Sequence, residues 1–129
     1  MTRPPSGMPP PSSVELDGAR LELTPLAETV AERYFAEFPE DLERYGDAAL
    51  PWEIHDTLHT FNWAILDVRG FTNLETNMLW LARVLVARDF PLEHLARNVE
   101  LCADVVSDER LATVLRGAAV SVRGYSPGG

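Results

Sequence analysis

Apolar side chains recur at helical spacing in five successive stretches of the chain, and Pro or Gly stands between most of these stretches. In the first stretch, Leu26, Val30, Tyr34 and Phe38 follow one another at intervals of four. Residues three or four positions apart share one face of an α-helix. The pattern therefore predicts an all-α domain of about five helices, packed as a compact helical bundle or in a globin-like way.

Local signals mark the expected ends of the first helices. Thr24 precedes Pro25, which favours a helix start because Thr can cap and Pro suits the first turn. Pro51 is expected to open the longest helix. That helix should run to about Arg69 and end at Gly70, since Gly readily adopts the left-handed conformation that terminates helices.

Similar signals follow in the second half of the chain. Residues 72–75 read TNLE, which matches a capping box in which Thr72 caps the next helix. Pro91 is placed to open a fourth long helix, and Ser107 or Asp108 can cap the last one. The short loops between these segments favour a bundle.

The two ends of the chain have a different composition from its middle. Residues 1–13 are dominated by Pro, Ser and Gly and are predicted to form a disordered arm, as are residues 124–129. A single helical domain is expected over residues 14–123. Within it, Val14–Leu23 is open to more than one interpretation, because its Asp17-Gly18 step is a hairpin signal. The segment could instead form a helical turn, or an arm that pairs with a second copy.

Charge and residue usage exclude several classes of function. The net charge of −9 disfavours binding to nucleic acids and to anionic membranes, since both carry negative charge. All eleven basic residues counted as Lys plus Arg are Arg, so lysine-based Schiff chemistry is excluded. Cys102 is the single cysteine, so no intrachain disulfide can form, and a cytoplasmic location is expected.

The longest predicted helix carries two distinct seams. One is apolar and is expected to face the core; it comprises Ile54, Leu58, Phe61, Ile65 and Val68. The other is semi-polar and lies at the edge of the first; it comprises Trp52, His55, His59, Asn62 and Leu66. Mixed seams of this kind suit an interface or a small pocket. We therefore expect Trp52, His55, His59 and Asn62 to contact a ligand or a partner.

The paired histidines also admit a cofactor. His55 and His59 are four positions apart, which lets two imidazoles face one divalent metal ion. The sequence HDTLH has Asp56 where a zinc peptidase would have Glu, and a third ligand is not evident. A haem iron held by one histidine is a second alternative. His94 is the remaining candidate, but its place in the first turn of a helix predicts an exposed side chain.

Three other side chains could carry function. Trp80 could stack on a ligand or a partner, although core packing is the commoner role of such an aromatic. Arg88 could bind an anion or pair with one of the many carboxylates. Cys102 falls on an apolar helix face and is expected to be an inert, buried thiol.

Residues 45–106 show a family resemblance. The helix containing HDTLHTFNWAILD, followed by WLARVLVARDFPLEHLARNVELCADVV, resembles the N-terminal sensor domain of the stressosome co-antagonist proteins. The rhythm of Trp80, Leu81, Arg88 and Pro91 carries the likeness. The resemblance implies a globin-like domain that usually lacks haem, pairs with a second copy and passes a signal to a partner. A second domain that would relay a signal is not expected here, which departs from that family.

The sequence therefore leads to one main hypothesis and two alternatives. The main one is a non-enzymatic regulatory or sensory module that acts as a homodimer and binds a partner protein or a small ligand. The first alternative is a metal- or haem-binding protein that uses His55 or His59. The second is a scaffold or cargo adaptor that docks through the Pro-rich arm.

Overall fold

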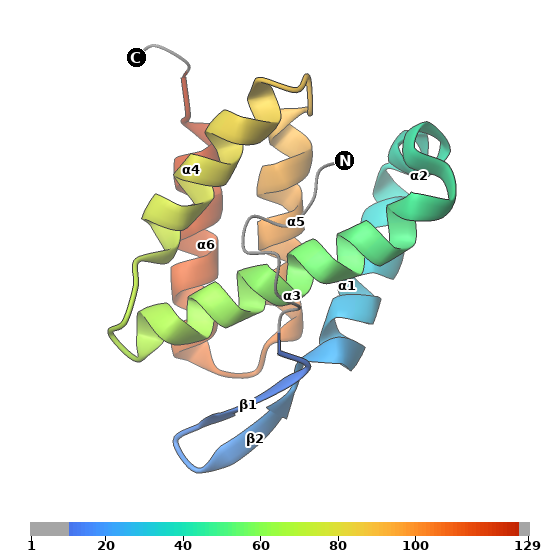
Figure 1. Ribbon diagram of the computed structural model, residues 1–129. Helices are drawn as coiled ribbons and strands as arrows, with labels where there is room; N and C mark the ends of the chain where they lie inside the picture. Colours follow the sequence, from blue (N-terminus) through green and yellow to red (C-terminus); the bar gives the residue numbers. More distant parts are fainter. Residues whose placement is uncertain (1–10, 127–129) are drawn as a thin grey trace.

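A computed structural model of the protein describes residues 11–126. Its described part is an all-α bundle preceded by a β-hairpin, as Figure 1 shows. The elements are β1 (Ser13–Leu16), β2 (Ala19–Glu22), α1 (Leu23–Glu37), α2 (Pro39–Tyr45), a 3-10 turn (Gly46–Ala48), α3 (Ala49–Val68), α4 (Leu74–Val86), α5 (Leu92–Val105) and α6 (Glu109–Arg123). Five of the helices are 13 to 20 residues long, so the predicted number of long helices is confirmed.

The long helices pack around α3, which is continuous to Val68 as the sequence predicted, although it begins at Ala49 rather than at Pro51. On one side of the bundle α5 lies along α6, and α4 covers α6. On the other side α1 packs against both α3 and α5, while the short α2 joins α1 to α3. The predicted apolar seam of α3 lies in the core, where Phe61 and Ile65 are each 1% exposed. No helix among residues 11–126 is both long and apolar enough to cross a membrane.

The hairpin interpretation of the segment after residue 13 is confirmed. Val14 pairs with Leu21 and Leu16 with Ala19 in an antiparallel ladder. Asp17 and Gly18 both have positive φ, at 53° and 81°, which is the backbone that a tight two-residue hairpin turn requires. A free hairpin would be marginal in water, but here the buried Leu16 fixes it to the core of the bundle.

Two predicted helix starts are wrong in detail. The first helix begins at Leu23, and Thr24 is not its cap; the carbonyl of Ser12 instead accepts from the N–H groups of Leu23 and Thr24 at 2.8 and 3.3 Å. Helix α4 is capped by Asn73 rather than by Thr72, because the Asn73 side chain accepts from the N–H of Thr76. An Asx side chain competes well for this position, and its neighbour Thr72 accepts from Asn77 instead.

The predicted ends of the domain also need correction. Residues 11–13 and 124–126 are described by the structure, whereas the rest of both predicted tails lies outside the described residues. Ser13 is the first residue of β1, and the backbone N–H of Tyr125 donates to Val122 at 3.0 Å. Tyr125 is half-buried against the core. The ordered domain therefore extends past both predicted boundaries.

Candidate functional site: a polar pocket between α1 and α5

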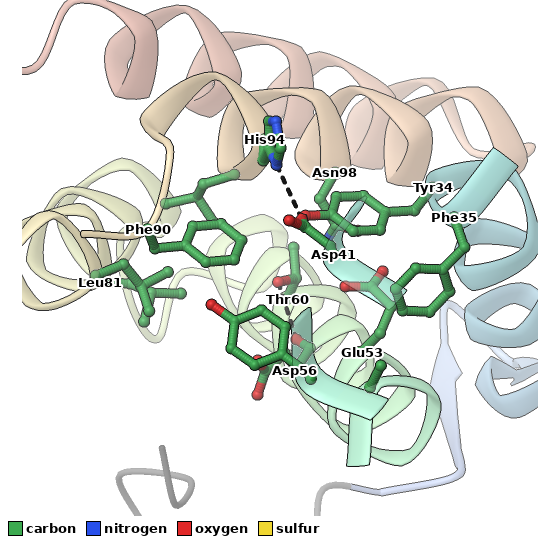
Figure 2. Close-up of a pocket in the computed structure, with 14 residues that line it drawn as sticks. Tyr34, Phe35, Asp41, Glu53, Asp56, Thr60, Leu81, Phe90, His94 and Asn98 are labelled. Atoms are coloured by element: carbon green, nitrogen blue, oxygen red, sulfur yellow. Dashed lines mark hydrogen bonds and ion pairs between the residues drawn. The ribbon is translucent and has the colours of Figure 1, made fainter. Parts of the chain in front are cut away.

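A partly enclosed pocket lies where five helices meet, and Figure 2 shows it in close-up. The cavity itself is small, with a volume of about 40 Å³, and the hollow around it opens to solvent. Aromatic and aliphatic side chains form much of its wall, and polar groups from α1, α2, α3 and α5 converge on it. The lining residues discussed below are Tyr34, Asp41, Tyr45, Glu53, Asp56, Thr60, Phe90, His94 and Asn98.

Asp41 is the centre of the hydrogen bonding in this pocket. The residue is 4% exposed, although it lies on the short helix α2. Its Oδ2 accepts from the hydroxyl of Tyr34 on α1 and lies 2.8 Å from Nδ1 of His94 on α5. Burial and the neighbouring Asp41 carboxyl raise the pKa of Tyr34, so the phenol keeps its proton and acts as a donor. One carboxyl thereby connects three helices.

The prediction that His94 is exposed is wrong. Its side chain is 13% exposed, and its ring stacks on Phe38 with 3.8 Å between centroids. Nε2 lies on the other side of the ring, 4.0 Å from the exposed carboxylate of Glu40. Helix α5 packs against α1, and Glu40 and Asp41 of α2 lie beside the His94 ring, which is why a position that is usually exposed is covered here.

A second buried carboxyl, that of Glu53, comes from α3. Glu53 is 9% exposed and accepts a 3.0 Å hydrogen bond from the hydroxyl of Thr57, one turn further along the helix. Burial raises the pKa of Glu53 well above its ordinary value, and the charges of Asp56 and Asp41 act in the same direction. Glu53 is therefore a carboxyl that readily holds a proton.

Asp56 is the third acid of the pocket. Burial raises the pKa of Asp56 to about 7. The side chain is still 39% exposed, so water screens its charge more than it screens that of Glu53. We therefore place Asp56 at the mouth of the pocket and Glu53 deeper inside it.

Asn98 on α5 completes the polar lining and is itself incompletely bonded. It is 6% exposed, and its Oδ1 is buried without a hydrogen-bond partner among the described residues. A buried amide oxygen of this kind carries a desolvation penalty of about 1–3 kcal/mol. Asn98 thus carries an unused acceptor in the wall of the pocket.

The six residues singled out from the sequence lie elsewhere. None of Trp52, His55, His59, Asn62, Trp80 and Arg88 is among the side chains that line this pocket. Trp52 and Asn62 are half-buried on α3, and Arg88 is exposed in the turn after α4. Trp80 is 40% exposed, so its expected role in core packing is wrong, whereas contact with a partner stays a prediction.

His55 and His59 do form a local cluster on the outer side of α3. Their rings lie 4.7 Å apart, and His59 also neighbours Trp63 at 5.9 Å between centroids. Burial lowers the pKa of both imidazoles, and the charge of His55 lowers that of His59 further. Nε2 of His59 is buried and has no hydrogen-bond partner in the part of the chain that the structure describes. The predicted semi-polar seam is therefore half-buried, as expected.

These histidines do not join a larger set of metal ligands. Within residues 11–126 no group of three or more His, Cys, Asp or Glu side chains is placed to hold a metal ion. Two imidazoles alone make a weak site, since zinc is normally held by at least three protein ligands. Cys102 is fully buried on α5, and burial raises the pKa of its thiol, in agreement with the expected unreactive role.

One part of the pocket had a sequence signal that the two-seam interpretation overlooked. Positions 49, 53, 57, 60 and 64 recur at helical spacing, and all five are buried. This third face of α3 carries Glu53, Thr57 and Thr60 between two alanines. A run of polar residues on a face flanked by small ones is the pattern that could have indicated a pocket.

Comparisons of the chain with protein-family models, with curated proteins and with solved structures found no match. The resemblance of residues 45–106 to the stressosome sensor domain accordingly stays a prediction from the sequence.

Proposed function

We propose that the protein is a non-enzymatic, cytoplasmic regulatory module that binds a small ligand in the pocket between α1 and α5. The observation that carries this proposal is the buried, unpartnered Oδ1 of Asn98 in a pocket that also holds Asp41 and Glu53. Concave sites with a few convergent polar groups on a largely apolar wall are where proteins usually bind small molecules.

If the pocket had no ligand to bind, a more stable fold would result from apolar side chains in place of its buried polar ones. A polar group buried without a partner destabilises the fold, and an apolar residue of similar shape would remove the penalty. Glu53 and Asn98 are both more than nine-tenths buried on helices that otherwise present apolar faces to the core. Polar groups retained at such positions are typical of sites whose function outweighs stability.

The variant Asn98→Leu distinguishes the effect of Asn98 on fold stability from its effect on ligand binding. We expect this variant to be more stable than the wild type by about 1–2 kcal/mol, because it removes the unpaired amide, and to melt roughly 3–6 °C higher. It should also lose ligand binding, measured as chemical-shift changes of pocket residues on addition of a library of fragment-sized compounds. A variant that is less stable and still binds the wild-type hits would contradict the proposal.

We further propose that the domain pairs with a second copy or a partner protein through the face of α3 that carries His55 and His59. The half-buried cluster of His55, His59 and Trp63, whose rings lie 4.7 and 5.9 Å apart in succession, supports this, because mixed aromatic and polar surfaces suit interfaces. His55→Ala combined with His59→Ala should shift the protein from dimer to monomer while leaving helicity nearly intact. Analytical ultracentrifugation and circular dichroism measure the two effects, and an unchanged mass would disprove this part.

A further inference from the structure

Acidic side chains line the pocket, whereas the neighbouring Arg97 is not among its lining residues. The lining carries the carboxyls of Asp41, Glu53 and Asp56, and no Arg is among the described residues that form it. Arg97 immediately precedes Asn98 on α5, yet its guanidinium binds Glu37 at 2.9 Å and Glu100 at 3.3 Å. The nearest basic residue in sequence is thus held outside the pocket.

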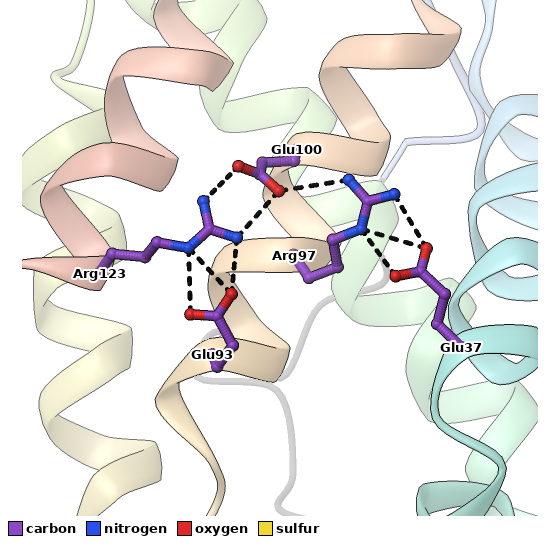
Figure 3. Close-up of polar contacts among 5 residues, drawn as sticks. All are labelled: Glu37, Glu93, Arg97, Glu100 and Arg123. Atoms are coloured by element: carbon purple, nitrogen blue, oxygen red, sulfur yellow. Dashed lines mark hydrogen bonds and ion pairs between the residues drawn. The ribbon is translucent and has the colours of Figure 1, made fainter.

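Figure 3 shows what holds it there. Arg97 and Arg123 are joined through Glu100, and each also binds a further carboxylate, Glu37 on α1 for Arg97 and Glu93 on α5 for Arg123. Arg123 donates to Glu93 at 2.8–3.0 Å. These surface carboxylates bind the guanidinium groups of both Arg97 and Arg123, so neither group neutralises the acids of the pocket.

The polar groups that face the pocket are mainly hydrogen-bond acceptors. Carboxyl oxygens of Asp41, Glu53 and Asp56 accept, and so does the free Oδ1 of Asn98. Tyr34 already directs its hydroxyl proton to Asp41. A ligand that supplies donors is therefore favoured. An anionic ligand would meet three acids, and the basic side chain of His94 in the lining is already engaged with Asp41.

The apolar wall adds a second requirement. Tyr34, Phe35, Tyr45 and Phe90 place aromatic rings around the same space. Aromatic faces attract organic cations through their quadrupoles, most strongly where water is excluded. Rings and acids together form a site for a positively charged head group attached to an apolar body.

We propose that the ligand of this pocket is a small organic cation, an amine of low molecular weight whose ammonium group donates to Glu53 and Asn98. The inference rests on the proposed ligand-binding function and specifies the chemistry of that ligand. In the empty pocket a proton on Glu53 avoids a buried charge; the bound ammonium replaces this proton as the positive partner of the carboxylate, and the displaced proton leaves to solvent.

Binding is therefore expected to tighten as pH rises over the range in which Glu53 loses its proton. The ionisable groups that surround Glu53 in the pocket come from four helices and comprise Tyr34 on α1, Asp41 and Tyr45 on α2, Asp56 on α3, and His94 on α5. Cys102 on α5 lies close enough to feel the charge of Glu53. The acids act on Glu53 with the same sign, because like charges favour its protonated form.

Three probes of similar shape and different charge test the inference on the full chain: 2-phenylethylamine, 2-phenylethanol and 3-phenylpropionate. Isothermal titration calorimetry at pH 8 should give an affinity for the amine at least about tenfold above that for the alcohol, because the charge-assisted hydrogen bonds form only with the amine. The carboxylate should not bind measurably. Glu53→Gln should reduce the affinity for the amine by about tenfold and leave that for the alcohol unchanged.

Glu32→Gln is the matched control, since Glu32 is exposed on α1 and the chemical change is identical. It should leave the affinity for all three probes unaltered. Equal binding of amine and alcohol, or an equal loss in both Glu variants, overturns the proposed ligand class. The proposed ligand-binding function is decided separately by the fragment library and Asn98→Leu, so the class can fail while that function stands.

Discussion

Asp41→Ala is expected to lower the free energy of unfolding by about 2–4 kcal/mol, the largest effect of any single change in the pocket. The Asp41 carboxyl is the common acceptor for Tyr34 and His94, and both of these side chains are largely buried. Removing it leaves a buried hydroxyl and a buried imidazole without their partner. It also removes the polar link that holds the short α2 against α1 and α5.

Urea unfolding followed by circular dichroism measures this loss. Glu43→Ala is the matched control, because Glu43 is an exposed acid on the same helix and should change the free energy of unfolding by no more than about 0.5 kcal/mol. Tyr34→Phe keeps the ring and removes one of the two donors, so it should fall between the two variants. An Asp41→Ala protein as stable as the Glu43→Ala protein would show that this contact does not hold the helices together.

Glu53→Gln is expected to change how stability depends on pH. The folded protein binds the Glu53 proton more tightly than the unfolded chain does, because burial raises the pKa of Glu53. The stability that this proton contributes is complete below the unfolded pKa, whose ordinary value is 4.5, and is lost as the pH rises through the folded pKa. Between the unfolded and the folded pKa of Glu53, the wild type should lose up to about 1.4 kcal/mol of stability per pH unit. The Glu53→Gln variant should not show this loss.

Unfolding curves collected from pH 4 to pH 9 give both profiles. The two proteins should diverge as the pH rises, with Glu53→Gln gaining stability relative to the wild type. Asp56 titrates in the same sense and is present in both proteins, so the difference between the profiles reports Glu53 together with its electrostatic coupling to Asp56. Parallel profiles for wild type and variant would mean that the Glu53 carboxyl is solvated like any surface acid.

The fold was predictable from the sequence because its signals are local. Each long helix repeats apolar residues on one face, and the Asp17-Gly18 turn encodes its own backbone geometry. The first residues of the helices were less predictable, since Thr72 and Asn73 compete for one capping position and only the detailed geometry decides between them.

The pocket was less predictable because its central contact is not local. Asp41 and His94 are 53 positions apart, and nothing near either residue indicates the other. Glu53, Thr57 and Thr60 share a helical face that the sequence does reveal, but only the packing of α5 beside it makes that face part of a pocket. His55 and His59 on α3 have the spacing typical of a ligand pair, yet they lie outside the pocket.

The short α2 has one side in the pocket and the other in water. Asp41 is 4% exposed, whereas the next residue, Leu42, is 45% exposed. A guest molecule that drew Asp41 away from Tyr34 or His94 would loosen the attachment of this seven-residue helix, and the whole helix would have to shift with it. The orientation of Leu42 on the outer surface would change as a result, so a neighbouring protein could detect an occupied interior without touching it.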